Sequence, residues 1–178
     1  MNTLPAKAAF AATLACLLAT SVAAAPEDPV REVMSVTVSN WAGDAPFQDL
    51  FSQERLDRLF SDDFKAAYAR AMTTPDAEEM GTPFDYDVVV NAQDGCPLRD
   101  VTIAPAVSEG DATVVDVRFR FLTCSGEPPA NQAWSETQFV IVDEAGKDRI
   151  DDIIATNPEG MTLSARDQLD AVTDTSAD

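Results

Sequence analysis

Three carboxylates, a phenol and an amide are grouped within one short stretch near the middle of the chain. They belong to Asp85, Tyr86, Asp87, Gln93 and Asp94, in a long connection that is rich in glycine and proline. A loop of this length in a compact domain often lines a functional surface, so these residues are the best candidates for a binding site. The alternative, which we favour, is that Gln93 and Asp94 bond to the loop backbone and that Asp94 begins a turn.

A second pair of carboxylates, Asp151 and Asp152, lies on neighbouring positions of a predicted strand, so the two side chains are expected to face opposite sides. Burial of either one in a pocket would raise its pKa and suit it to act as a general base. Such a base needs a donor to the developing oxyanion, and Tyr68 and Tyr86 are the two phenols of the chain. We favour a salt bridge instead, with one of three arginines as the partner: Arg118, Arg120 or Arg149.

The chain contains no histidine. This removes the usual Ser-His-Asp and Cys-His catalytic arrangements and the commonest zinc ligand. A calcium site built from Asp85, Asp87, Asp94 and the pair at 151–152 is chemically possible, because hard cations take several oxygen ligands. No loop has the EF-hand spacing, however, and we predict neither a metal nor a cofactor.

The beginning of the chain has the pattern of a secretory signal. One basic residue precedes an apolar run over residues 8–18, and Val22 and Ala24 suit the −3 and −1 positions of a cleavage site. We therefore predict a signal peptide over residues 1–24 and an exported mature protein, periplasmic or secreted. Lipid anchoring at Cys16 is not expected, because the residues before it match the lipoprotein pattern poorly.

The charge of the chain is strongly acidic. Its 178 residues carry 12 basic and 31 acidic side chains, a net charge of −19 that becomes −20 when Lys7 leaves with the signal. This excludes nucleic acid and anionic lipid surfaces as partners, since both need a basic footprint. No apolar run after the signal is long enough to span a membrane. The charge permits a basic partner protein or a cation, and solubility alone is its simplest explanation.

Helices are predicted in the first half of the mature chain. Residues 28–41 carry an apolar helical face, although three β-branched residues within them also alternate as in a strand. Two shorter helices are predicted over 53–60 and 62–72, because Ser52 and Ser61 are suitable N-caps and apolar residues follow at helical spacing.

A hairpin and a disulfide are predicted together in the second half. Strands over 98–105 and 113–123 flank a turn at Gly110. A register symmetric about Gly110 makes one face apolar and pairs polar residues on the other: Asp100 with Arg120, and Thr102 with Arg118. The same register places Cys96 opposite Cys124 with Cα atoms about 4.5–5.5 Å apart, which a disulfide can span. Two thiols in an oxidising compartment also favour this bond.

Two further strands, over 133–142 and 149–155, complete the predicted domain of residues 25–157. Residues 158–178 are predicted to be a polar tail, partly disordered, with a weak helix over 164–172 that begins with a capping box. Five aromatic side chains could line a ligand cavity, but core packing is the simpler expectation: Trp41, Phe119, Phe121, Trp134 and Phe139.

Three motifs follow one another along the chain: a helix start from Leu50-Phe51-Ser52 to Leu59-Phe60, the loop end Asn91-Ala92-Gln93-Asp94, and the closing strand Arg149-Ile150-Asp151-Asp152-Ile153. In this order they resemble the nuclear-transport-factor-2-like superfamily, and within it a bacterial exported family of unknown function. The resemblance covers residues 28–157. The chain departs from the pattern at Asp148, which stands where a tryptophan is usual.

This resemblance implies an α+β fold in which N-terminal helices pack on a curved, cone-like antiparallel sheet, here of about four strands. In such a cone the loop around residues 85–94 would fold over the mouth of the cavity. The resemblance brings no catalytic assignment with it.

We therefore expect a non-catalytic exported module that binds an unknown small ligand or a basic partner protein. One alternative is a cone-fold isomerase or hydro-lyase with Asp151 or Asp152 as the base and a tyrosine as the donor. Another is an inhibitor or immunity-type protein that neutralises a basic exported enzyme through charge complementarity.

Overall fold

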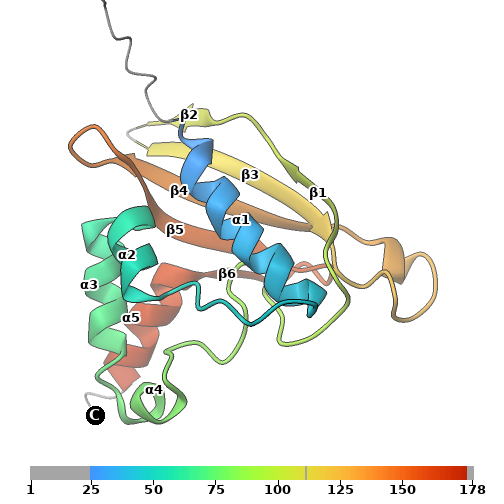
Figure 1. Ribbon diagram of the computed structural model, residues 1–178, viewed down its shortest axis with the longest axis horizontal. Coiled ribbons are helices and arrows are strands. Elements are labelled where there is room, and N and C mark those ends of the chain that lie inside the picture. Colours follow the sequence, from blue (N-terminus) through green and yellow to red (C-terminus); the bar gives the residue numbers. More distant parts are fainter. Residues whose placement is uncertain (1–24, 111, 176–178) are drawn as a thin grey trace, which may run out of the picture.

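In the part of the chain that the structure describes, four α-helices precede a six-stranded sheet and a fifth α-helix follows it (Figure 1). The computed structural model describes residues 25–110 and 112–175. The predicted signal over residues 1–24, including Cys16, lies outside the described residues. The helices are α1 (Glu27–Ala42), α2 (Gln53–Leu59), α3 (Asp62–Ala71), α4 (Pro75–Met80) and α5 (Ala165–Thr175). The strands are β1 (Arg99–Ile103), β2 (Val107–Glu109), β3 (Ala112–Arg120), β4 (Ser135–Asp143), β5 (Asp148–Thr156) and β6 (Thr162–Ser164).

The sheet is antiparallel and open. Its strand order is β1-β3-β4-β5-β6, and β2 pairs with β3 beyond the end of β1. Helix α1 crosses one face, and α2, α3 and α5 are grouped beside β5 (Figure 1). The predicted α+β class is therefore confirmed. Among the described residues, no helix has the length and apolar character that crossing a bilayer requires.

The sheet has six strands, and the expectation of about four was too low. One additional strand arises because the predicted strand over 98–105 ends at Ile103 and pairing resumes at Val107. Pro105 lies in the gap and has no N–H to donate to a ladder. The other is β6, which pairs with the end of β5 inside the segment that was predicted to be a tail.

The predicted register of the hairpin holds at its centre and shifts by one residue at each end. Thr102 pairs with Arg118 as predicted, but Val107 pairs with Val114. Near the start of β1, an irregularity places Asp100 at φ 54°. The expected contact between Asp100 and Arg120 survives this irregularity as an ion pair at 3.4 Å.

The predicted disulfide is present between Cys96 and Cys124, whose Cα atoms are 5.8 Å apart. Gly95 precedes it at a point where the chain passes very close to the end of the hairpin. A Cβ atom at position 95 would lie 2.6 Å from a ring carbon of Phe121 and 2.9 Å from Trp41. Only glycine fits there without displacing its neighbours.

Local signals explain the helix boundaries. The predicted helices 53–60 and 62–72 agree with α2 and α3 to within one residue. The Ser61 hydroxyl accepts a hydrogen bond from Phe64 N at 2.9 Å and so caps α3. Helix α4 was not predicted. It begins at Pro75 and ends at Gly81, which adopts a left-handed φ of 76°.

The space between α1, α3 and the sheet is filled with apolar side chains. Burying each of the larger ones stabilises the fold by about 1.5–3 kcal/mol. The largest side chains that are fully buried come from α1, α3, α5, the end of α2, the loop between α4 and β1, and the three long strands: Val30, Val33, Phe60, Phe64, Val89, Val90, Phe119, Phe139, Ile141, Ile150, Ile153 and Leu169. Three of the aromatic residues expected in the core are indeed buried: Phe119, Phe121 and Phe139.

Helix α5 packs onto the rest of the domain from within the predicted tail. Its N-terminus is capped as expected, because the Ser164 hydroxyl accepts a hydrogen bond from Asp167 N at 3.0 Å. Leu169 is fully buried, and Arg70 of α3 forms an ion pair with Asp170 at 3.1 Å. These contacts fix one side of the candidate site.

Candidate binding groove

Two recesses open next to each other around the end of α4 and the residues that follow it. The first, of about 560 Å³, lies between the C-terminal half of α1, residues 47–51 and residues 80–93; we call it the α1 recess. The second, of about 500 Å³, lies between α4, α5 and residues 83–86; we call it the α5 recess. They share four lining residues, and together they form the groove: Met80, Phe84, Asp85 and Tyr86.

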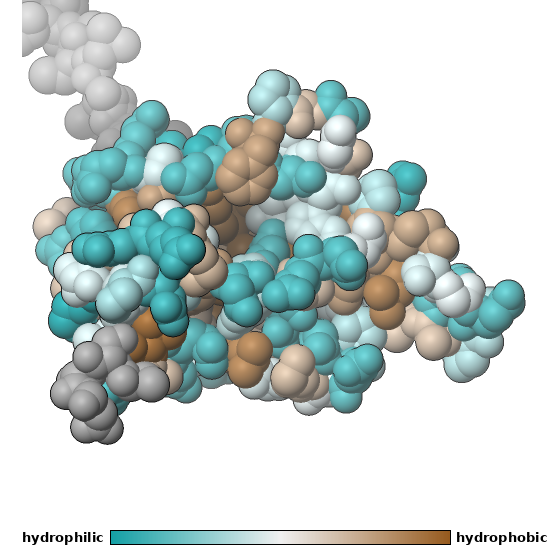
Figure 2. Space-filling model, turned by 90° about the horizontal axis from the view of Figure 1, so that it is seen from below, coloured by the Kyte–Doolittle hydropathy of each residue, from teal (hydrophilic) through white to brown (hydrophobic). Residues whose placement is uncertain are grey.

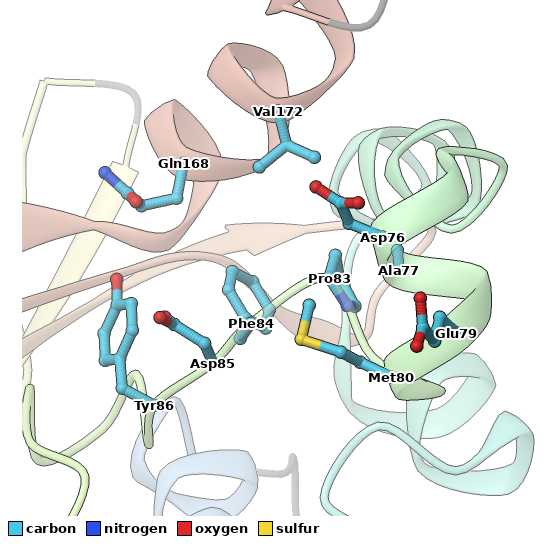
Figure 3. Close-up of a pocket in the computed structure, with 10 residues that line it drawn as sticks. All are labelled: Asp76, Ala77, Glu79, Met80, Pro83, Phe84, Asp85, Tyr86, Gln168 and Val172. Carbon is cyan, nitrogen blue, oxygen red and sulfur yellow. The ribbon is translucent and has the colours of Figure 1, made fainter.

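The α5 recess is assembled from three segments that are distant in sequence (Figure 3). Helix α4 contributes Asp76 and Glu79 from one side, and α5 contributes Gln168 and Val172 from another. The segment from Phe84 to Tyr86 leads away from α4 and passes below α5 in this view, and the Tyr86 hydroxyl points towards the side of Gln168 (Figure 3). The recess therefore combines carboxylates and neutral polar groups with apolar walls.

Every charged side chain of the described residues that lines the two recesses is acidic. Asp76, Glu79 and Asp85 line the α5 recess, and Asp49 and Asp87 line the α1 recess. Among the described residues, no lysine or arginine lines either of them. This arrangement suits a cationic group, because an opposite charge would relieve the repulsion among these carboxylates.

The two phenols of the chain are held neutral. Burial, followed by the nearby charge of Asp49, raises the pKa of Tyr68 to about 12. Burial, followed by the charge of Asp85, also raises the pKa of Tyr86. The Tyr86 hydroxyl therefore stays protonated at neutral pH and offers both a donor and an acceptor to whatever occupies the groove.

Apolar side chains are exposed at the rim of the α1 recess. Phe47 is 80% exposed and Met80 is 51% exposed, while Phe51 and Phe84 form the floor between them and the core. Figure 2 shows that this side of the molecule is hollowed, with hydrophobic residues at the hollow and hydrophilic residues around it. Large apolar side chains gathered in this way mark a surface that binds a partner or ligand.

The loop that carries Asp85 and Tyr86 is fixed by hydrogen bonds of Asp87. The Asp87 carboxylate accepts hydrogen bonds from Val89 N at 2.8 Å, from Val90 N at 3.2 Å and from Trp41 Nε1 at 2.8 Å. These three donors come from the loop itself and from α1. Asp87 therefore holds the loop against the first helix.

A second set of bonds ties the same loop to the sheet. Asn91, at φ 55°, donates from its side chain to the carbonyls of Ala155 and Met161. The Thr137 hydroxyl donates to the Val89 carbonyl at 2.6 Å. The groove is thus built on a rigid segment, which is a favourable base for a binding site.

The five loop residues that the sequence singled out have different roles. Asp85 and Tyr86 line both recesses, and Asp87 lines the α1 recess while it binds the loop backbone. Gln93 also lines the α1 recess, and it donates to the Asp85 carbonyl at 3.1 Å, as the simpler alternative expected. Asp94 is exposed and lines neither recess.

The sequence suggested that Asp151 and Asp152 face opposite sides of the sheet. In the structure, both side chains contact Arg166. The carboxylate of Asp151 lies 3.1 Å from Arg166 Nη1, and that of Asp152 accepts a hydrogen bond from Arg166 N at 3.0 Å. The reason is a bulge in β5. Asp152 pairs with Val140 and Ile150 pairs with Ile141, which leaves Asp151 as an extra residue.

The predicted salt bridge exists, but its partner is Arg166 rather than any of the arginines that were named. Arg118 pairs with Glu136 at 3.0 Å and Arg120 pairs with Asp100 at 3.4 Å. Their guanidinium groups also lie 5.0 and 4.3 Å from the centre of the Trp134 ring. The third arginine, at position 149, donates to the backbone of α2.

The structure does not bring the acidic candidates together as a metal site. Within residues 25–110 and 112–175, no group of three or more histidine, cysteine, aspartate or glutamate side chains could hold a metal ion. Neither Asp151 nor Asp152 lines the groove. The general base that was considered and Tyr86, the phenol that lines the groove, therefore lie in separate sites.

The residues of the α5 recess that were not predicted from the sequence include Asp76, Glu79, Gln168 and Val172. Asp76 and Glu79 belong to an acidic run after Pro75, a charge pattern that could have been noticed. Gln168 and Val172 carried no such signal, because only the packing of α5 against α3 brings them near residues 76–86.

We compared the chain with protein-family models, curated proteins and solved structures, and none matches it. The groove is therefore interpreted from its own residues.

Six carboxyl groups of the described residues have pKa values displaced in two opposite directions. Burial is the main cause of a raised pKa in three of them: Asp87, Asp148 and Asp152. Hydrogen bonds are the main cause of a lowered pKa in three others: Glu27, Glu32 and Asp62. The donors are the backbone N–H of Ala106, the Arg58 guanidinium and the Lys65 ammonium, respectively.

We expect the free energy of unfolding to be highest at about pH 4.5 and to fall on both sides. A raised folded-state pKa gives stability that is complete below the unfolded value and is lost as the pH rises through the folded value. A lowered pKa gives stability that is lost as the pH falls through it. Urea denaturation at about pH 3, 4.5 and 7 measures this profile.

In the double variant Asp87→Asn, Asp152→Asn, the free energy of unfolding should fall less between about pH 4.5 and about pH 7 than it does in the wild type. The matched variant Asp85→Asn neutralises an exposed carboxylate and should leave that slope unchanged. A wild-type urea midpoint that rises steadily up to neutral pH would contradict the expectation.

Proposed function

We propose that this chain is an exported, non-catalytic module of the nuclear-transport-factor-2-like class, and that its groove binds a cationic group. The observation that carries the proposal is the groove itself. Its carboxylates include Asp76, Glu79 and Asp85, and no basic residue among those described balances them. All seven ion pairs of the described residues lie elsewhere in the structure.

Other features support export and the class. A disulfide between Cys96 and Cys124 persists in oxidising compartments and is rare in reducing ones. The order of the elements, helices first and then an antiparallel sheet crossed by α1, is the order that the resemblance implied. A catalytic role for Asp151 or Asp152 has less support, because both carboxylates are engaged with Arg166.

Neutralising the carboxylates of the α5 recess should weaken the binding of a basic probe. In the triple variant Asp76→Asn, Glu79→Gln, Asp85→Asn, we expect a fluorescein-labelled hexalysine peptide to bind about tenfold more weakly than to wild type. Each lost ion pair between a carboxylate and a peptide lysine lowers the binding free energy by about 0.5 kcal/mol. Fluorescence anisotropy at about 20 mM salt measures the affinity, and about 300 mM salt should remove most of the difference.

The matched control is Asp63→Asn, Glu109→Gln, Glu127→Gln. It changes the net charge by the same amount at exposed positions that line neither recess. If both triple variants lose affinity equally, the peptide responds to net charge, and the groove is not its site. If wild type does not bind the peptide at low salt, the proposed function fails.

A further inference from the structure

We propose that the occupant of the groove is a segment of a partner protein, with a basic side chain in the α5 recess and an apolar side chain in the α1 recess. This inference rests on the proposed function, because it assumes that the groove binds a cationic group. It goes further by naming the class of ligand and the role of each recess.

The α5 recess has the chemistry to hold a lysine or arginine side chain. Its carboxylates attract the charged end, and the Tyr86 hydroxyl offers an additional acceptor. The aliphatic stem of the same side chain needs apolar walls, which Phe84, Met80 and Val172 provide. A bare metal ion would not use these walls.

The α1 recess offers apolar side chains that an apolar group can contact. Leu50, Phe51 and Phe84 line it, and Phe47 stands at its rim with 80% of its surface exposed. A small amine in the neighbouring recess would leave Phe47 in water. An extended chain that carries an apolar residue would cover it, and buried aromatic anchors of this kind contribute most to protein interfaces. This contrast favours a protein segment over a free amine.

Phe47 is held in its exposed position by the loop that carries it. Gln48 N donates to Asn40 Oδ1 at 2.9 Å, and Asn40 Nδ2 donates to the Gln48 carbonyl at 2.8 Å. The Arg55 guanidinium donates to Asp49 O and to Gln48 Oε1. Because this loop is already ordered, a partner would not have to fix it on binding, which favours affinity.

The wall between the two recesses suits an occupant that reaches both. Met80, Phe84, Asp85 and Tyr86 line both sides of it. The flexible Met80 side chain is 51% exposed and can adapt to the chain that crosses it. Asp85 stands on this wall, so one carboxylate serves an occupant of either recess.

Three labelled peptides of equal length test the inference on the disulfide-bonded protein. The first alternates lysine and leucine, the second replaces each leucine by serine, and the third replaces each lysine by serine. We expect the lysine–leucine peptide to bind about tenfold more tightly than the lysine–serine peptide. We expect the leucine–serine peptide to bind more weakly than either.

Two variants test which recess causes each difference in peptide affinity. Phe47→Ser should abolish the advantage of the lysine–leucine peptide and leave the lysine–serine peptide unchanged. The matched control is Val107→Ser, which removes an apolar side chain that is 56% exposed on β2, and it should change neither affinity. The pair Asp76→Asn, Glu79→Gln should weaken both lysine peptides.

The outcomes separate this inference from the proposed function. Equal affinity for the two lysine peptides would overturn the role of the α1 recess and leave cation binding intact. Spermidine that displaces the lysine–leucine peptide and itself binds as tightly would identify a free amine as the ligand instead. Absence of binding by both lysine peptides would overturn the proposed function together with this inference.

Discussion

Replacing Cys96 and Cys124 by alanine is expected to lower the free energy of unfolding by about 3.5 kcal/mol in the chain-entropy account of disulfides. The two residues are 28 positions apart, so the bond closes a loop that would otherwise be open in the unfolded chain. The loss is a large fraction of the stability of a domain of this size. Urea denaturation of the oxidised wild type and of the double variant measures it.

Reduction of the wild type provides the control for this first prediction. A reductant should move the wild-type urea midpoint to that of the double alanine variant and should leave the variant itself unchanged. The single variant Cys96→Ala should behave like the double one, because it also lacks the bond. An oxidised wild type no more stable than the double variant would mean that the bond adds nothing.

Asp87→Ala is expected to cost about 3 kcal/mol of stability, because three donors lose a charged acceptor at once. The carboxylate binds the N–H groups of Val89 and Val90 and the indole of Trp41. Without it the loop that carries Asp85 loses its attachment to α1. Urea denaturation measures the stability of this variant. Fluorescence anisotropy without urea measures its affinity for the hexalysine peptide.

Two neighbouring carboxylates serve as controls for Asp87. Asp85→Ala should keep the wild-type stability and lose affinity for the peptide, because Asp85 is exposed and lines both recesses. Asp94→Ala should change neither quantity. An Asp87→Ala variant as stable as the Asp94→Ala variant would show that the three hydrogen bonds do not hold the loop.

Local patterns in the sequence were enough to predict four of the five α-helices of the described residues, all but α4, and the centre of the sheet. The serines at positions 52 and 61 stand at the N-cap positions of α2 and α3, and of these two only Ser61 forms the side-chain capping hydrogen bond. The pairing of Thr102 with Arg118 followed from alternation about Gly110. The disulfide followed from the same register, since both cysteines lie on the continuation of these strands.

The features that were missed depend on contacts between distant segments. The bulge at Asp151 is a property of how β5 pairs with β4, and alternation within β5 alone cannot show it. The same bulge explains why Arg166 was not recognised as the partner of Asp151. The α5 recess could be predicted only in part for a related reason. One of its walls is formed by residues 76–86, which are close in sequence, and the other is formed by the distant helix α5.

The bulge in β5 also connects the groove to a part of the sheet that does not line it. It turns both Asp151 and Asp152 towards Arg166, in the first turn of the helix that carries Gln168 and Val172 into the α5 recess. A substitution at the bulge would remove these contacts with the start of α5 while every groove residue kept its identity. Related chains could therefore diverge in ligand preference through changes in a strand that no ligand touches.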